Sequence, residues 1–113
     1  MVAKSKIYDK HYAQLSAGVV GYALRVSPNA ILADSRGSNS ESRARQIAMY
    51  LTYVGFELSL ARVALAFGRD RSTVAHACRQ IEDARDATEF DSWLNQLERG
   101  LHLLAPLSID IAA

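Results

Sequence analysis

The 113-residue sequence contains only one cysteine, two prolines and six glycines. A single thiol cannot form an internal disulfide and does not supply a metal framework, so we expect neither. The low proline and glycine content disfavours both a disordered chain and a turn-rich β fold. No apolar run approaches the roughly 20 residues that span a bilayer, and Arg25 interrupts the best candidate for a signal sequence. We therefore expect a cytoplasmic protein that does not insert into a membrane.

The charges are unevenly distributed along the chain. Half of the residues are hydrophobic and 22% are charged, and the length fits one domain over residues 1–113. The net charge of +1 conceals eight arginines against five acids in residues 36–85, and one arginine against five acids in residues 86–113. The basic centre favours a surface that faces an anion, with chance clustering on a solvated face as the alternative.

Apolar residues recur at helical spacing along most of the chain, and no segment alternates as a strand does. The first helix should end near Pro28, and a short second helix should follow at residues 30–33. The predicted inner stripe of the first helix is Tyr8, Tyr12, Leu15, Val19, Tyr22 and Val26. The polar segment 35–42 is the clearest loop. Ser38 and Glu41 have the spacing of a capping box, which places a third helix at about residues 42–54.

Two short helices joined by a glycine-containing turn are predicted within residues 59–85. Ser59 is a suitable N-cap for the first, and Gly68 would end it. Asp70 or Ser72 can cap the second, whose buried stripe would be Val74, Ala77, Cys78 and Ile81. Such a pair is a helix-turn-helix.

A last amphipathic helix is predicted over residues 88–104, with Thr88 as its cap. Its apolar stripe is Phe90, Trp93, Leu94, Leu97, Leu101 and Leu104. We expect this stripe to pack in the core, with an exposed seam for a homodimer or a partner protein as the alternative. The apolar tail at residues 103–113 could pack down or remain exposed.

The outer side of the second short helix carries hydrogen-bonding side chains: Arg71, Ser72, Thr73, His76, Arg79 and Gln80. The first turn of a recognition helix enters the DNA major groove, where hydroxyls can meet phosphate and arginine can pair with guanine. A metal site formed by His76 and Cys78 is disfavoured, because two helical residues two apart face different ways.

Two segments carry a specific resemblance. The run RARQIAMYL (residues 43–51) followed by SLARVALAFGRDRSTVAHACRQIE (residues 59–82) resembles the C-terminal DNA-binding domain of DnaA, the bacterial replication initiator. The resemblance extends less specifically over about residues 15–104. It implies an all-α bundle of five to six helices that contains a helix-turn-helix, as in initiator C-terminal and Trp-repressor-like folds.

The resemblance also implies roles for individual residues. Arg45 and Gln46 match residues that grip the DNA backbone, and Arg69 and Thr73 match phosphate contacts. Asp70 and Ser72 match base-contacting positions, and Arg36 is the candidate for an arginine inserted into the minor groove. From their charge and position we add Arg43, Arg71, His76 and Arg79 to the predicted DNA surface.

Some positions depart from the family pattern. Arg71 stands where the family has a histidine, and one glycine of the usual pair before Arg69 is missing. Tyr53 replaces a basic residue, and Ala61 and Arg62 replace a Pro-Glu pair. Because Arg71 favours guanine or phosphate, we expect weaker or altered selectivity for the initiator's box.

These patterns predict a non-enzymatic, nucleoid-associated protein without cofactors that binds double-stranded DNA and regulates replication initiation or transcription. No phosphate-binding G-x-x-x-x-G-K-[ST] motif occurs, so we expect no ATP binding. The alternative is a protein-interaction module that binds the initiator or its regulators and modulates initiator activity. The replaced histidine favours this alternative, and the retained Arg-Gln and Arg-Asp-x-Ser-Thr residues oppose it.

Overall fold

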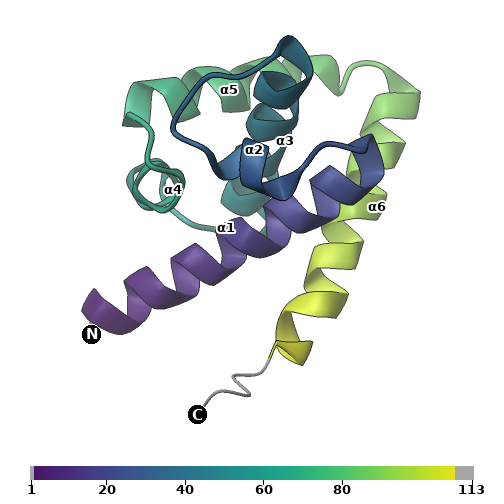
Figure 1. Ribbon diagram of the computed structural model, residues 1–113. Coiled ribbons are helices and arrows are strands. Elements are labelled where there is room, and N and C mark those ends of the chain that lie inside the picture. Colours follow the sequence, from purple (N-terminus) through teal and green to yellow (C-terminus); the bar gives the residue numbers. More distant parts are fainter. Residues whose placement is uncertain (1, 109–113) are drawn as a thin grey trace.

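A computed structural model describes residues 2–108, and the side chains of residues 6–108. This part of the chain is all-α, as predicted. Figure 1 shows α5 along one edge of the molecule and the far ends of α1 and α6 at the opposite edge. The elements are α1 (Val2–Leu24), α2 (Pro28–Leu32), α3 (Asn39–Gly55), α4 (Leu60–Phe67), α5 (Arg71–Ala84), α6 (Thr88–Leu104) and the 3-10 turn η1 (Ala105–Leu107).

Local signals set most of the helix ends. The predicted capping box forms, because the Glu41 amide donates to Ser38 Oγ at 3.1 Å and the Ser38 amide donates to Glu41 Oε1 at 2.8 Å. The third helix therefore starts at Asn39, three residues before the predicted boundary at residue 42. Gly68 ends α4 in the left-handed conformation, with φ of 64°.

The prediction that Thr88 caps the last helix was wrong. Thr88 is itself the first residue of α6, and Ala87 occupies the N-cap without a side-chain hydrogen bond. The acidic residues Glu89 and Asp91 lie in the first turn, where they stabilise the positive end of the helix dipole. This favourable charge makes a side-chain cap dispensable.

The predicted inner face of the first helix was only partly correct, because Tyr12, Leu15 and Val19 pack half-buried against the core. Tyr8 and Tyr22 are 55% and 89% exposed. The face that packs inward carries mostly small residues, namely Asp9, Ala13, Ser16, Ala17 and Val20. Small side chains let α1 lie close to α3, where Thr52 Oγ1 is 2.8 Å from Ser16 Oγ and 2.7 Å from the Ala48 carbonyl. Tyr8 and Tyr22 are therefore left outside, whereas Tyr12 stacks on Phe56.

The helix-turn-helix packs on the rest of the protein through its predicted apolar stripe. Val74, Ala77, Cys78 and Ile81 of α5 are all buried. Burial raises the pKa of the Cys78 thiol to about 11, so this thiol stays neutral. On α4, Arg62 donates to both carboxylate oxygens of the buried Asp9, at 2.9 and 2.7 Å. The departure from the family pattern at Arg62 thus serves a bidentate ion pair that ties α4 to α1.

Polar side chains fix the C-terminal end of α5 between α3 and α6. Arg85 donates to the Tyr50 hydroxyl at 2.9 Å, to Asp91 Oδ1 at 2.5 Å and to Asn95 Oδ1 at 2.6 Å. The Tyr50 hydroxyl in turn donates to the Glu82 carboxylate. Burial and this bond raise the pKa of Tyr50 to about 12, so the phenol stays protonated as a donor.

The predicted stripe of α6 is only partly in the core. Leu94 and Leu101 are buried, whereas Leu104 is 45% exposed. Phe90, Trp93 and Leu97 pack against the core and remain half-buried. The prediction that the apolar tail packs down or remains exposed falls partly outside the described residues, which end at residue 108. Within the described part, no helix is both long and apolar enough to cross a membrane.

Candidate nucleic-acid interface

The outer face of α5 presents a row of exposed polar side chains. An α-helix advances 100° per residue, so Ser72, His76 and Arg79 follow one another along the middle of the face opposite the buried stripe. Thr73 and Gln80 lie on one flank of this row and Arg71 on the other. All six side chains are exposed. The predicted reading residues of α5 are therefore brought together on one solvent-facing surface.

The start of this helix also leaves its first residues accessible. Asp70 occupies the N-cap position with an extended backbone, but its side chain makes no capping hydrogen bond. Asp70 is exposed at the N-terminal end of α5, where the first-turn amides have no side-chain cap. Backbone amides at a helix N-terminus attract phosphate, and a carboxylate can accept from a base amino group.

The N-terminal half of α3 lies beside α5 and extends the surface. Gln46 Nε2 donates to Gln80 Oε1 at 3.1 Å, which links the two helices directly. Arg43 Nη1 lies 3.4 Å from Gln46 Oε1, and the Arg43 guanidinium stacks 5.8 Å from the centre of the Phe90 ring. Arg43 is exposed and Gln46 half-buried, so Arg43 offers its positive charge to solvent.

Arg45, a predicted phosphate contact, has a buried side chain that is bound within the protein. Its side chain is only 4% exposed, although the sequence places it on the helix predicted to grip DNA. Nε donates to the Ile31 carbonyl at 2.7 Å, Nη2 to the Ala30 carbonyl at 2.8 Å and Nη1 to the Arg36 carbonyl at 3.0 Å. Burial lowers its pKa, and the nearby charge of Arg69 adds to that effect. Arg45 thus directs its charge into the protein.

Arg69, the other predicted phosphate contact before α5, is half-buried. Its Nη2 donates to the Ala33 carbonyl at 2.8 Å and to the Ser35 carbonyl at 3.3 Å. Residues 33–38, which we name the 33–38 loop, connect α2 to α3. Arg69 therefore links the turn of the helix-turn-helix to this loop.

Arg36 lies exposed in the 33–38 loop. Its Nη1 donates to Asn39 Oδ1 at 3.2 Å. The next residue, Gly37, has φ of 73°, and a Cβ there would overlap the Glu41 carboxylate that completes the capping box. Glycine is therefore required beside Arg36 for this path of the chain.

A shallow groove of about 310 Å³ forms where the loop, α3 and α5 meet. Arg36, Arg69 and Thr73 line it, together with Gln46, His76 and the edge of Arg45. Asp34 and Ser42 also line the groove and were not predicted. The only sequence signal for them is the polar loop 35–42, which contains Ser42 and directly follows Asp34. The groove joins the predicted minor-groove residue to the predicted reading helix.

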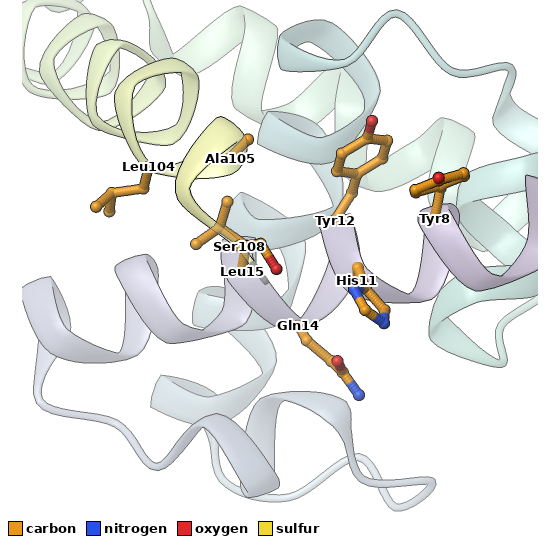
Figure 2. Close-up of a pocket in the computed structure, with 8 residues that line it drawn as sticks. All are labelled: Tyr8, His11, Tyr12, Gln14, Leu15, Leu104, Ala105 and Ser108. Atoms are coloured by element: carbon orange, nitrogen blue, oxygen red, sulfur yellow. The ribbon is translucent and has the colours of Figure 1, made fainter. Parts of the chain in front are cut away.

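A larger hollow of about 640 Å³ lies between α1 and the end of α6. Figure 2 shows Tyr8, His11 and Tyr12 on α1, with Leu104 and Ala105 on the facing segment. Its lining contains no arginine and no residue of α3, α4 or α5. This hollow is separate from the groove beside α5 and differs from it in chemistry.

The fold and the groove define a class: a helical domain with a helix-turn-helix whose outer face is lined by arginine and small polar residues. Residues 17–81 match the family model described as the bacterial dnaA protein helix-turn-helix. The match covers more than half of the chain, so the chain belongs to this family.

Two individual proteins agree with this assignment. The chain is 45% identical over 54 residues to the chromosomal replication initiator protein DnaA of Thermodesulfovibrio yellowstonii, and this stretch is 47% of the chain and 12% of that protein. A crystal structure of a DNA replication initiation factor superimposes with a TM-score of 0.76 at 30% identity, covering 88% of the chain and 31% of the other. The chain thus spans less than a third of either relative.

Proposed function

We propose that the chain binds double-stranded DNA with a sequence preference and regulates replication initiation or transcription. The observation that supports this best is the groove that brings Arg36 next to the exposed reading face of α5. In this arrangement α5 enters the major groove while Arg36 reaches the neighbouring minor groove. The family assignment supports the same function.

Electrostatic affinity would come from the exposed arginines around this surface: Arg36, Arg43, Arg71 and Arg79. Each phosphate that an arginine neutralises releases bound counterions, so binding should weaken steeply as salt rises. Specificity would come from the middle of the exposed face of α5, where Ser72, His76 and Arg79 can reach base edges. Asp70 and Thr73 add an acceptor and a hydroxyl at the helix start.

Fluorescence anisotropy with an initiator-box duplex and a scrambled duplex, at two salt concentrations, tests this proposal. We expect tighter, salt-sensitive binding to the box. Arg43→Ala should weaken both complexes equally and lower the salt slope by about one, as for a phosphate contact. Arg99→Ala, an exposed arginine on α6, is the matched control and should change neither complex. Absence of binding at low salt would refute the proposal.

Arg71 provides a separate test of selectivity. Arg71→His restores the residue of the family pattern at an exposed position of the first turn of α5. We expect the ratio of box to scrambled affinities to rise about tenfold, because one well-placed base contact discriminates by about 1–3 kcal/mol. An unchanged ratio would exclude Arg71 as the cause of altered selectivity.

A second candidate function is a protein-interaction module that binds the initiator or its regulators. It is supported by exposed apolar side chains on the two segments that flank the larger hollow: Ile7, Tyr8, Leu103, Leu104 and Leu107. Exposed apolar groups gathered in this way are typical of protein contacts. Retained binding to purified full-length initiator by a chain that fails to bind DNA would favour this candidate. Tyr8→Ser should then weaken the complex.

A further inference from the structure

Two arginines hold the inner side of the connection between α2 and α3. Arg45 donates to the carbonyls of Ala30, Ile31 and Arg36, and Arg69 donates to those of Ala33 and Ser35. Five of the seven carbonyls of residues 30–36 are therefore bound by two guanidinium groups. A planar guanidinium presents its donors in a fixed fork, so it fixes the relative positions of the carbonyls that it binds.

These contacts replace stabilisation that the local sequence lacks. A five-residue helix such as α2 does not persist alone, because too few hydrogen bonds offset the cost of its nucleation. Its last carbonyls have no partner within the helix. Arg45 supplies charged donors there, and a positive charge also favours the negative end of a helix dipole. Arg45 acts as a C-terminal cap provided by a distant helix.

The exit of the connection is fixed independently. Gly37 has a positive φ and lies next to the Glu41 side chain, and the capping box of Ser38 and Glu41 then starts α3. Arg36 lies between these two fixed points, and its own carbonyl is one of the groups that Arg45 binds. Its side chain, in contrast, is exposed and makes a single local hydrogen bond to Asn39. The backbone of Arg36 is thus held while its guanidinium can reach a ligand.

We propose that Arg45, assisted by Arg69, is a positioning residue that presets the 33–38 loop so that Arg36 is presented to duplex DNA. A preset loop loses less conformational freedom when it binds, which strengthens the complex. The inference rests on the proposed function for its ligand. It replaces the expected phosphate contact of Arg45 with an action through Arg36.

The loop itself can be tested without DNA. Amide exchange followed by NMR should be compared in the full chain, Arg45→Lys and Arg43→Lys. Lysine keeps the charge but lacks the fork. We expect the hydrogen-bonded amides of Ala30, Ile31 and Ala33 to exchange about tenfold faster in Arg45→Lys, through local opening. Arg43→Lys is the matched control, exposed and two residues earlier, and should leave them unchanged. Equal exchange in all three proteins would overturn the proposal.

DNA titrations then test the action through Arg36. Arg36→Ala should weaken binding about tenfold. Arg45→Lys should weaken it by a similar factor, and the double variant should bind no worse than either single variant, because both remove one contact. A phosphate contact predicts instead that Arg45→Lys retains affinity and that the effects of Arg36→Ala and Arg45→Ala multiply, and either result would overturn the proposal. If the unaltered chain binds no duplex, the proposed function fails while the exchange result still decides the positioning role.

A second variant covers the case in which Arg45→Lys does not fold. Arg69 is half-buried and holds only the Ala33 and Ser35 carbonyls, so Arg69→Lys should keep the helical circular dichroism of the unaltered protein. We expect the Ala33 amide, which donates to the Ala30 carbonyl beside the Arg69 contacts, to exchange several-fold faster in this variant. Unaltered exchange in folded Arg69→Lys would contradict a loop held by the two arginines.

Discussion

The outer face of α5 and the 33–38 loop form one surface, but arginine serves them in different ways. Arg71 and Arg79 of α5 are exposed, and their guanidinium groups make no hydrogen bond to any residue that the structure describes. Arg45, beneath the loop, is 4% exposed and donates to three backbone carbonyls. One region offers its guanidinium groups to a ligand, and the other uses them to build the backbone that carries Arg36.

The difference shows that residue type alone does not identify which arginines have guanidinium groups free for a ligand. Arg43 and Arg45 lie two positions apart on α3, and that spacing turns one side chain to solvent and the other to the interior. The relevant quantity is the number of donors already bound within the protein. The three predictions below test this contrast, from the largest expected change in unfolding free energy to the smallest.

Arg45→Met should produce the largest loss of stability. It keeps most of the side-chain volume but removes the guanidinium donor of three carbonyls, of which the Ala30 carbonyl keeps a bond from the Ala33 amide at 3.4 Å. This loss should lower the free energy of unfolding by about 2–4 kcal/mol. Arg79→Met removes an exposed charge and should change it by no more than about 0.5 kcal/mol. Urea unfolding followed by circular dichroism measures both. Equal effects would remove the contrast between the two regions.

Gly37→Ala should have an intermediate effect. Alanine is strained at φ of 73°, and its Cβ would displace the Glu41 carboxylate, so we expect a loss of about 1–2 kcal/mol. Gly100→Ala is the control, since a Cβ there meets nothing within 4 Å. The higher helix propensity of alanine should raise the free energy of unfolding of this variant by about 0.5–1 kcal/mol. We therefore expect Gly37→Ala to lower the melting temperature and Gly100→Ala to raise it. A stabilising Gly37→Ala would show that the loop is not fixed at its exit.

The two helix caps of the helix-turn-helix should give the smallest difference. Ser59 Oγ accepts from the Arg62 amide at 3.2 Å, so Ser59→Ala should cost about 1 kcal/mol. The Asp70 side chain makes no such bond, so Asp70→Ala should cost only a few tenths of a kcal/mol, from its charge near the helix dipole. If Asp70→Ala costs as much as Ser59→Ala in thermal unfolding, Asp70 is a structural cap and not a free reading group.

Short-range signals predicted the helix-turn-helix and most helix ends, although not the cap of α6 or the first residue of α3. The capping box at Ser38, the N-cap at Ser59 and the left-handed Gly68 depend on residues within one turn of each other. The buried stripe of α5 follows from the 3.6-residue period, which turns every residue of one face in the same direction. The exposed row of Ser72, His76 and Arg79 follows from the same period, because it is the opposite face.

Long-range contacts decided the rest. Large apolar residues suggested an inner face for α1 that is only partly correct, because close packing against α3 selects small residues such as Ala13 and Ala17 for its centre. The partner of Arg62 is Asp9, 53 positions away. Neither the packed face of α1 nor the partner of Arg62 can be predicted from a local sequence pattern.

The sequence by itself determined an all-helical chain, a helix-turn-helix and a cluster of arginines around it, because periodicity and capping act within a few residues. Only the tertiary structure decided which arginines face solvent. Arg45 and the Ile31 carbonyl lie 14 positions apart, and Arg69 and the Ala33 carbonyl lie 36 apart. The guanidinium groups of Arg45 and Arg69 bind these carbonyls only when α2, α3 and the α4–α5 turn pack together. Burial then makes the hydrogen bonds necessary, because buried polar groups need partners.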